Sequence, residues 1–155
     1  MKASLLMGLV AGARSMTPLA MIAWLARAGE LPNTGSLNRL LSRPSVVAGA
    51  TALAAGELLG DKMRSAPDRI VIPGLAARIV SGGLAGAAMA RKGDEASAAL
   101  LGAVAAVGAS YVTFATRCYF LERYGQRRSG VVEDALVLAC AVWIANNSRR
   151  SRSAR

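Results

Sequence analysis

The chain has 155 residues, a length that suits one domain and is short for two. Hydrophobic residues make up 54% of it and aromatic residues only 5%, which argues against a soluble core, because such cores draw much of their buried area from Phe, Tyr and Trp. The net charge is +10, but the basic residues form no dense stripe with interleaved aromatics, so we expect no nucleic-acid partner.

Five apolar segments rich in Ala, Gly, Leu and Val follow one another along the chain, at 3–26, 45–60, 70–90, 96–120 and 131–145. About twenty helical residues cross the ~30 Å hydrocarbon core of a bilayer, and the first, third and fourth segments reach that length. The second and fifth are shorter, which leaves open whether they span fully. The pattern predicts an all-α, polytopic transmembrane bundle over residues 1–147, followed by a basic disordered tail at 148–155.

The first segment begins like a secretory signal, with Lys2 followed by the apolar run 5–11 and small residues. Apolar sequence resumes after Ser15, however, and continues to Leu25, which favours a retained helix over cleavage. Pro18 removes a backbone donor and frees a carbonyl one turn back, near Arg14. We therefore expect a broken or kinked helix around Arg14, buried in protein or lining a cavity.

A charged side chain at the bilayer centre costs about 2.5–3.5 kcal/mol, so Arg14 and the neighbouring Ser15 are candidates for contact with an anion or substrate. The alternative is a structural arginine paired with a carboxylate from another helix. The second segment carries Glu57 and, four residues later on the same helix face, Asp61 with Lys62 beside it. These carboxylates could bind a cation or relay protons, or Glu57 could neutralise an arginine while Asp61 and Lys62 form a solvated pair.

Arg78 lies near the centre of the third segment, and Glu133 and Asp134 open the fifth. Acidic residues are favoured at a helix amino terminus by its dipole, so a simple capping role is one interpretation of that pair. The other is a buried, charge-balanced cluster of these side chains with Arg14 and Glu57.

Pairs of glycines four residues apart occur in three segments, at Gly8/Gly12, Gly56/Gly60 and Gly82/Gly86. Such spacing lets helices approach closely in lipid, so we expect tight helix packing around them. The first and fourth segments also share an L-x-G-x-x-A spacing, and three intervening turns would make them antiparallel. An inverted repeat, a recurrent transporter architecture, is therefore a further expectation.

The sidedness of the bundle is only weakly marked by charge. With five spans, seven basic residues fall on the amino-terminal side and nine on the other, which leans towards a cytoplasmic carboxyl terminus. Multi-pass insertion into the inner, cytoplasmic membrane is the predicted location.

Several motifs together resemble a known family. They are Gly12-x-Arg14-Ser15-x-x-Pro18-Leu19, Glu57-Leu-Leu-Gly-Asp61-Lys62, Pro67-x-Arg69, Arg78 and the pair Glu133-Asp134. This set resembles the small bacterial membrane proteins catalogued as domain of unknown function 4126. Arg64 stands where that family tends to carry a proline, which affects the shape of one loop. The resemblance implies the membrane architecture and no activity.

The leading functional hypothesis is a transporter or channel for a small ion or solute, working as a homodimer or larger assembly in the lipid bilayer. A membrane scaffold or accessory subunit, in which buried charges fix helix register, is the alternative. Without histidine, and with Cys118 and Cys140 inside apolar runs, no nucleophile is paired with a base. We therefore expect no enzymatic activity, no cofactor and no metal site.

Overall fold

The structure is a computed structural model, and it describes residues 1–32, 35–60, 72–124, 135, 137–144 and 146. Throughout these residues the regular structure is helical, which confirms the all-α prediction. The six helices with continuous bounds are α1 (Lys2–Ala13), α2 (Met16–Arg27), α3 (Ser36–Leu41), α4 (Pro44–Gly60), α5 (Ile72–Ala88) and α6 (Glu95–Tyr124). Residues 137–144 are also helical.

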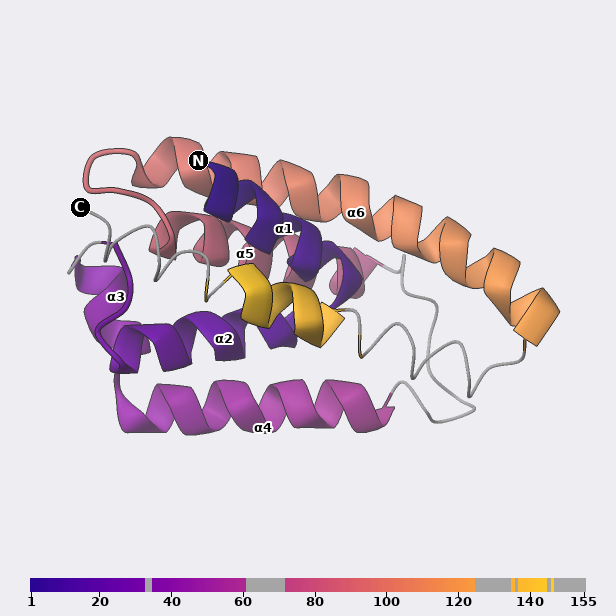
Figure 1. Cartoon of the computed structure of the whole chain (residues 1–155), viewed down its shortest axis with the longest axis horizontal. Helices are drawn as coiled ribbons and strands as arrows, with labels where there is room; N and C mark the ends of the chain where they lie inside the picture. The colour runs from indigo at the N-terminus through magenta and orange to yellow at the C-terminus, as the bar shows by residue number, and fades with distance from the viewer. Residues whose placement is uncertain (33–34, 61–71, 125–134, 136, 145, 147–155) are drawn as a thin grey trace.

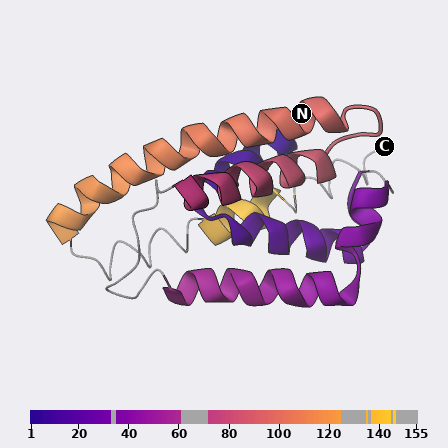
Figure 2. The same ribbon diagram turned by 180° about the vertical axis from the view of Figure 1, so that it is seen from behind.

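The predicted first span is two helices instead of one. α1 and α2 have 12 residues each, about 18 Å at 1.5 Å per residue, and they are separated by Arg14 and Ser15. In Figures 1 and 2, α2 runs back towards the end of the bundle from which α1 starts. The break was predicted, but a single membrane-crossing first segment was wrong, because the chain reverses direction there and forms a helical hairpin.

One layer of the bundle consists of α1, α5 and α6, which meet at glycines. A methyl group on Gly82 of α5 would lie 2.7 Å from both the Gly102 carbonyl oxygen and the Ala106 Cβ of α6. Gly8 of α1 also contacts Gly102, at its carbonyl oxygen and Cα. Helix backbones can approach this closely only where a residue has no Cβ. The Gly8/Gly12 and Gly82/Gly86 pairs therefore pack as predicted. Gly56 differs, since nothing lies within 4 Å of the position of its missing Cβ.

The register of these glycine contacts fixes the direction of the helices. Gly8 lies against Gly102 and Gly12 against Ala106, so α1 and α6 run parallel. The two segments with the shared L-x-G-x-x-A spacing are therefore not antiparallel, and the expected inverted relation between them is wrong. The extra reversal between α1 and α2 is the physical reason, because it changes the direction of every later helix relative to α1.

α2, α3 and α4 form the second part of the bundle. Trp24 of α2 donates its indole N–H to Thr51 of α4 at 3.1 Å, and the amide of Asn38 in α3 donates to the carbonyl of Ala88 at the end of α5 at 3.2 Å. α3 lies across the end of the bundle, roughly perpendicular to the long helices (Figure 1). It falls in the segment 28–44 that the sequence presents as a breaker-rich connection.

The hydrophobic core runs between the two parts. Met7 of α1 and Ile22 of α2 are fully buried and pack in one cluster with Ala85 of α5. Residues 137–144 contribute Val137 and Ile144 to the same cluster. One face of the amino-terminal hairpin thus packs into the core while Leu9 and Trp24 on its other face are exposed, and the residues of its turn, Arg14 and Ser15, are buried.

Candidate functional site: the helix break at Arg14 and Ser15

The break between α1 and α2 is a single extended residue. Arg14 has φ −144° and ψ 119°, whereas Ser15 has already returned to the helical region. Pro18 is the third residue of α2, a position where the missing N–H has no intrahelical acceptor in any case. The sequence therefore ends one helix and starts the next within two residues, and it leaves unsatisfied backbone groups on both sides of the break.

Glu57 of α4 satisfies the amides on the α2 side. Its Oε1 accepts hydrogen bonds from the backbone N–H and the hydroxyl of Ser15, each at 2.9 Å. Its Oε2 accepts the backbone N–H of Met16, also at 2.9 Å. A carboxylate at a helix amino terminus is favoured by the helix dipole, and hydrogen bonds to an ionised acceptor are stronger than neutral ones. Glu57 is therefore the capping residue of α2, supplied by another helix.

The α1 side of the break is satisfied from α6. The carbonyl of Gly12 accepts the hydroxyl of Ser110 at 3.3 Å and lies 3.5 Å from that of Thr113. Each hydroxyl has a single proton, and its shorter contact is within α6, from Ser110 to the Ala106 carbonyl at 2.7 Å and from Thr113 to the Ala109 carbonyl at 2.8 Å, so the Gly12 carbonyl receives the longer branch of a shared bond. The two ends of the broken helix are thus contacted by two different helices, α4 and α6, and these contacts stabilise the break.

Arg14 lies at the centre of this arrangement and is 1% exposed. Its Nη1 donates to the backbone carbonyl of Glu57 at 3.3 Å. That carbonyl belongs to the last turn of α4, where a helix carries partial negative charge. The contact between the two residues therefore joins the guanidinium to the α4 backbone, while the Glu57 carboxylate binds the start of α2.

The eight predicted site residues divide into three groups. Arg14, Ser15 and Glu57 lie together at the helix break. Arg78 of α5 is also buried, at 6% exposed, and its carbonyl accepts the Ser81 hydroxyl at 3.2 Å. The remaining four, Asp61, Lys62, Glu133 and Asp134, lie outside the described residues, as does the basic tail.

Sequence reasoning missed Ser110 and Thr113 as part of the site. Their spacing of three residues on an apolar helix is a weak signal, because Ser and Thr in such helices commonly bond to their own preceding turn. Within the part of the chain that the structure describes, no group of three His, Cys, Asp or Glu side chains gathers to hold a metal ion.

Fold and site together define the class: a small all-helical bundle whose interior carries two buried arginines and a broken helix capped by a carboxylate. The chain matches the family described as Domain of unknown function (DUF4126) over residues 2–146, and it belongs to that family. This confirms the resemblance carried by the motifs. Comparisons with curated proteins and with solved structures gave no match.

Proposed function

We propose that the protein is a polytopic inner-membrane protein that binds and conducts a small ion or solute at the helix break. Within the described residues one helix, Glu95–Thr116, is long and apolar enough to cross a bilayer by length and composition. The apolar helices Lys2–Ala13, Pro44–Leu59 and Ile72–Ala88 are shorter. In this arrangement α1 and α2 form a re-entrant hairpin that enters and leaves the bilayer on one side.

The surface of the bundle supports the membrane assignment. Large apolar side chains on its outer faces are exposed, including Leu59 of α4 at 68%, Ile72 of α5 at 85% and Leu100 of α6 at 67%. Exposed large apolar side chains on three helices are what contact with a membrane or a partner requires. Among side chains that the structure describes on α4, α5 and α6, the charged ones are Glu57, Arg78 and Glu95. Only Glu95, in the first turn of α6, is away from the interior.

The observation that carries the functional proposal is the convergence at Glu57. Two backbone amides and a hydroxyl point at its carboxylate, and the buried Arg14 guanidinium lies against the backbone of the same residue. Broken helices whose ends meet inside a bundle recur as ion and substrate sites in transporters. The donors around Glu57 select a negatively charged group, so a small anion that exchanges with the carboxylate is the solute this geometry favours.

Flux into liposomes tests this proposal. Purified protein is reconstituted, a membrane potential is imposed, and chloride and proton movement are followed with halide-sensitive and pH-sensitive dyes. We expect anion flux in the unchanged protein, no flux with Arg14→Gln and normal flux with Arg91→Gln. Arg91→Gln is the matched control, because it removes the same charge from an exposed residue on the α5–α6 turn. Size-exclusion profiles confirm that both variants remain folded. Equal flux in the two variants would contradict the site.

A second function is favoured by one feature of the same geometry. Both carboxylate oxygens of Glu57 are already bonded to α2, as expected for a purely structural cap. In that case the protein is a membrane scaffold or accessory subunit, with its charges fixing helix register. Absence of any flux above empty liposomes, together with loss of assembly in Glu57→Gln, would select this function over transport.

A further inference from the structure

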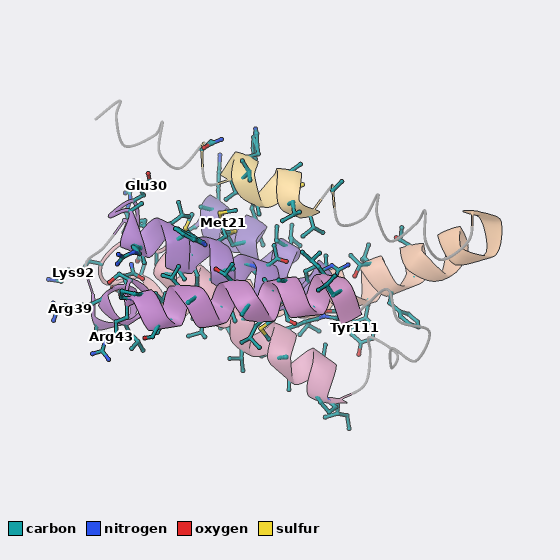
Figure 3. All side chains as sticks on the ribbon, turned by 90° about the horizontal axis from the view of Figure 1, so that it is seen from below. Met21, Glu30, Arg39, Arg43, Lys92 and Tyr111 are labelled. Atoms are coloured by element: carbon teal, nitrogen blue, oxygen red, sulfur yellow. The ribbon has the colours of Figure 1, made fainter. Side chains whose placement is uncertain are left out.

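Charged side chains collect at one end of the bundle. Outside the interior residues Arg14, Glu57 and Arg78, every charged side chain that the structure describes belongs to this group, which we call the basic end. Its members are Lys2, Arg27, Glu30, Arg39, Arg43, Arg91, Lys92, Asp94 and Glu95. Figure 3 shows four of them, Glu30, Arg39, Arg43 and Lys92, at the same end of the molecule.

Four separate parts of the chain build this end. The parallel register of α1 and α6, with Gly8 against Gly102, places Lys2 level with the first turn of α6. α2 ends at Arg27, and α3 is tied to the end of α5 by the Asn38 bond to the Ala88 carbonyl. The turn from α5 to α6 adds Arg91 and Lys92. Reversal of the chain at Arg14 is therefore what brings Lys2 to the same end as the other basic residues.

The charge at this end is unbalanced. It holds six basic and three acidic side chains, and all six basic side chains are exposed. Two features mark it as a membrane interface instead of a free aqueous surface. α3 lies across the helix ends with Leu40 49% exposed beside Arg39, and Trp24 is 56% exposed one turn before Arg27. Apolar and indole groups next to arginines match the headgroup level of a bilayer.

We propose that the basic end is a binding surface for the headgroups of anionic phospholipids. The inference rests on the membrane embedding proposed above. Arginine presents a planar set of donors to phosphate oxygens, and basic residues beside a membrane are attracted by the negative potential of anionic lipids. α3 then lies in the plane of the interface, with Leu40 towards the acyl chains and Arg39 and Arg43 at the phosphates.

Thermal unfolding in micelles of defined lipid composition tests whether the basic end binds anionic lipid. Purified full-length protein is placed in micelles containing phosphatidylglycerol or phosphatidylcholine at low salt. We expect phosphatidylglycerol to raise Tm above its value in phosphatidylcholine, and salt to diminish the difference by screening. The triple variant Arg39→Gln/Arg43→Gln/Lys92→Gln should lose this lipid preference.

A matched variant separates the surface from net charge. Arg149→Gln/Arg150→Gln/Arg152→Gln removes the same three charges from the tail and should keep the preference for phosphatidylglycerol. An equal Tm in both lipids for the unchanged protein would overturn the inference, and so would equal losses in the two triple variants. Release of the protein from membranes by alkaline carbonate would instead overturn the proposed membrane embedding, so the two failures are distinguishable.

Discussion

Glu57 performs the most specific task of any single residue in the described part of the chain. It is half-buried on α4, yet its two oxygens accept three hydrogen bonds from the first residues of α2. In an apolar interior the amides at the start of a helix need partners, because an unsatisfied buried donor costs about 1–3 kcal/mol. Glu57 thus links two helices and satisfies the break at the same time.

Replacing Glu57 should destabilise the protein in proportion to the bonds that are lost. We expect Glu57→Ala to lower the free energy of unfolding by about 2 kcal/mol and Glu57→Gln by about 1 kcal/mol, since the amide keeps one acceptor oxygen and loses the charge. Unfolding by a denaturing detergent in mixed micelles measures both values.

Glu95→Gln is the matched control for this prediction. Glu95 also accepts a backbone amide, that of Gly93 at 2.8 Å, but at the exposed end of the bundle. Its replacement should change the free energy of unfolding by no more than about 0.5 kcal/mol. Equal effects of Glu57→Gln and Glu95→Gln would show that the cap on α2 does not hold the break together.

The variant Ser15→Ala measures how much the Ser15 hydroxyl contributes to the free energy of unfolding, separately from its backbone N–H. Ser15→Ala removes the bond from Oγ to Glu57 and leaves the backbone N–H bond to the same oxygen. We expect a loss of about 0.5–1 kcal/mol, smaller than for Glu57→Ala, in the same unfolding measurement. A loss as large as that of Glu57→Ala would mean that the backbone bonds contribute nothing.

At the residue scale, the sequence identified Arg14, Ser15 and Glu57 as site residues but did not predict the hydrogen bonds that they make. Arg14, Pro18 and the small residues between them predicted a break, and intramembrane charge marked Glu57 as significant. Sequence reasoning left open a pairing of Arg14 with a carboxylate. Among the contacts of the described residues, the Glu57 carboxylate accepts backbone amides of Ser15 and Met16, and Arg14 donates to the Glu57 carbonyl. The amides become available only once the break is located to a residue and α4 lies beside it.

At the scale of helices, Gly102 is the point where α1, α5 and α6 converge. A methyl group there would lie 3.1 Å from both the carbonyl carbon of Gly82 and the Cα of Gly86. These are backbone atoms, which cannot move aside as a flexible side chain would. The three helices therefore depend on glycine at this position for their separation.

Gly102→Ala should destabilise the bundle by about 1–3 kcal/mol, because overpacking forces the helices apart. Gly108 lies on the same helix with nothing within 4 Å of its missing Cβ, so Gly108→Ala is the control. Alanine is the better helix former, and we expect that control to be neutral or stabilising by up to about 1 kcal/mol. Similar destabilisation by both substitutions in mixed-micelle unfolding would contradict the packing described for α6.

The extents of the later helices were predictable, while the path of the chain was not. α4, α5 and α6 begin and end within a few residues of the apolar segments, because apolar composition and breaker residues determine their limits. The angle at Arg14 was not predictable, since a proline and a charge indicate a break without fixing its direction. α3 was missed because Gly35, Pro32 and Pro44 dominate a short connection that holds only six helical residues.

At the scale of the whole molecule, the proposed membrane embedding rests on how apolar and charged side chains are distributed. Arg14 and Arg78 are buried together with small residues and with larger apolar ones such as Met7 and Ile22. Other large apolar side chains are exposed, and the remaining described charges apart from the half-buried Glu57 form the basic end. This account predicts that the expressed protein stays with the membrane fraction after alkaline carbonate washing. Recovery in the carbonate supernatant, measured by immunoblot beside a peripheral protein as control, would contradict it.

The sequence pattern predicted an all-helical bundle correctly, but the expected inverted relation between two of its segments was wrong. The L-x-G-x-x-A spacing shared by two segments marks their mutual contact, with Gly8 against Gly102, instead of an inverted duplication. A count of five spans places Lys2 on the side opposite Arg27, whereas in the structure both lie at the same end of the bundle, because one added reversal changes the end at which the amino terminus lies. Such reversals are invisible to a rule that counts apolar segments.

The reversal at Arg14 is tested most directly by cysteine labelling from one side of the membrane. Single-cysteine variants Lys2→Cys, Ser36→Cys and Ile72→Cys, in a Cys118→Ser/Cys140→Ser background, are treated with an impermeant maleimide before and after the membrane is opened. The account predicts that Lys2→Cys and Ser36→Cys label from the same side, and Ile72→Cys from the opposite side. Labelling of Lys2→Cys and Ser36→Cys from opposite sides would show that the first segment crosses the membrane once, and would contradict the hairpin.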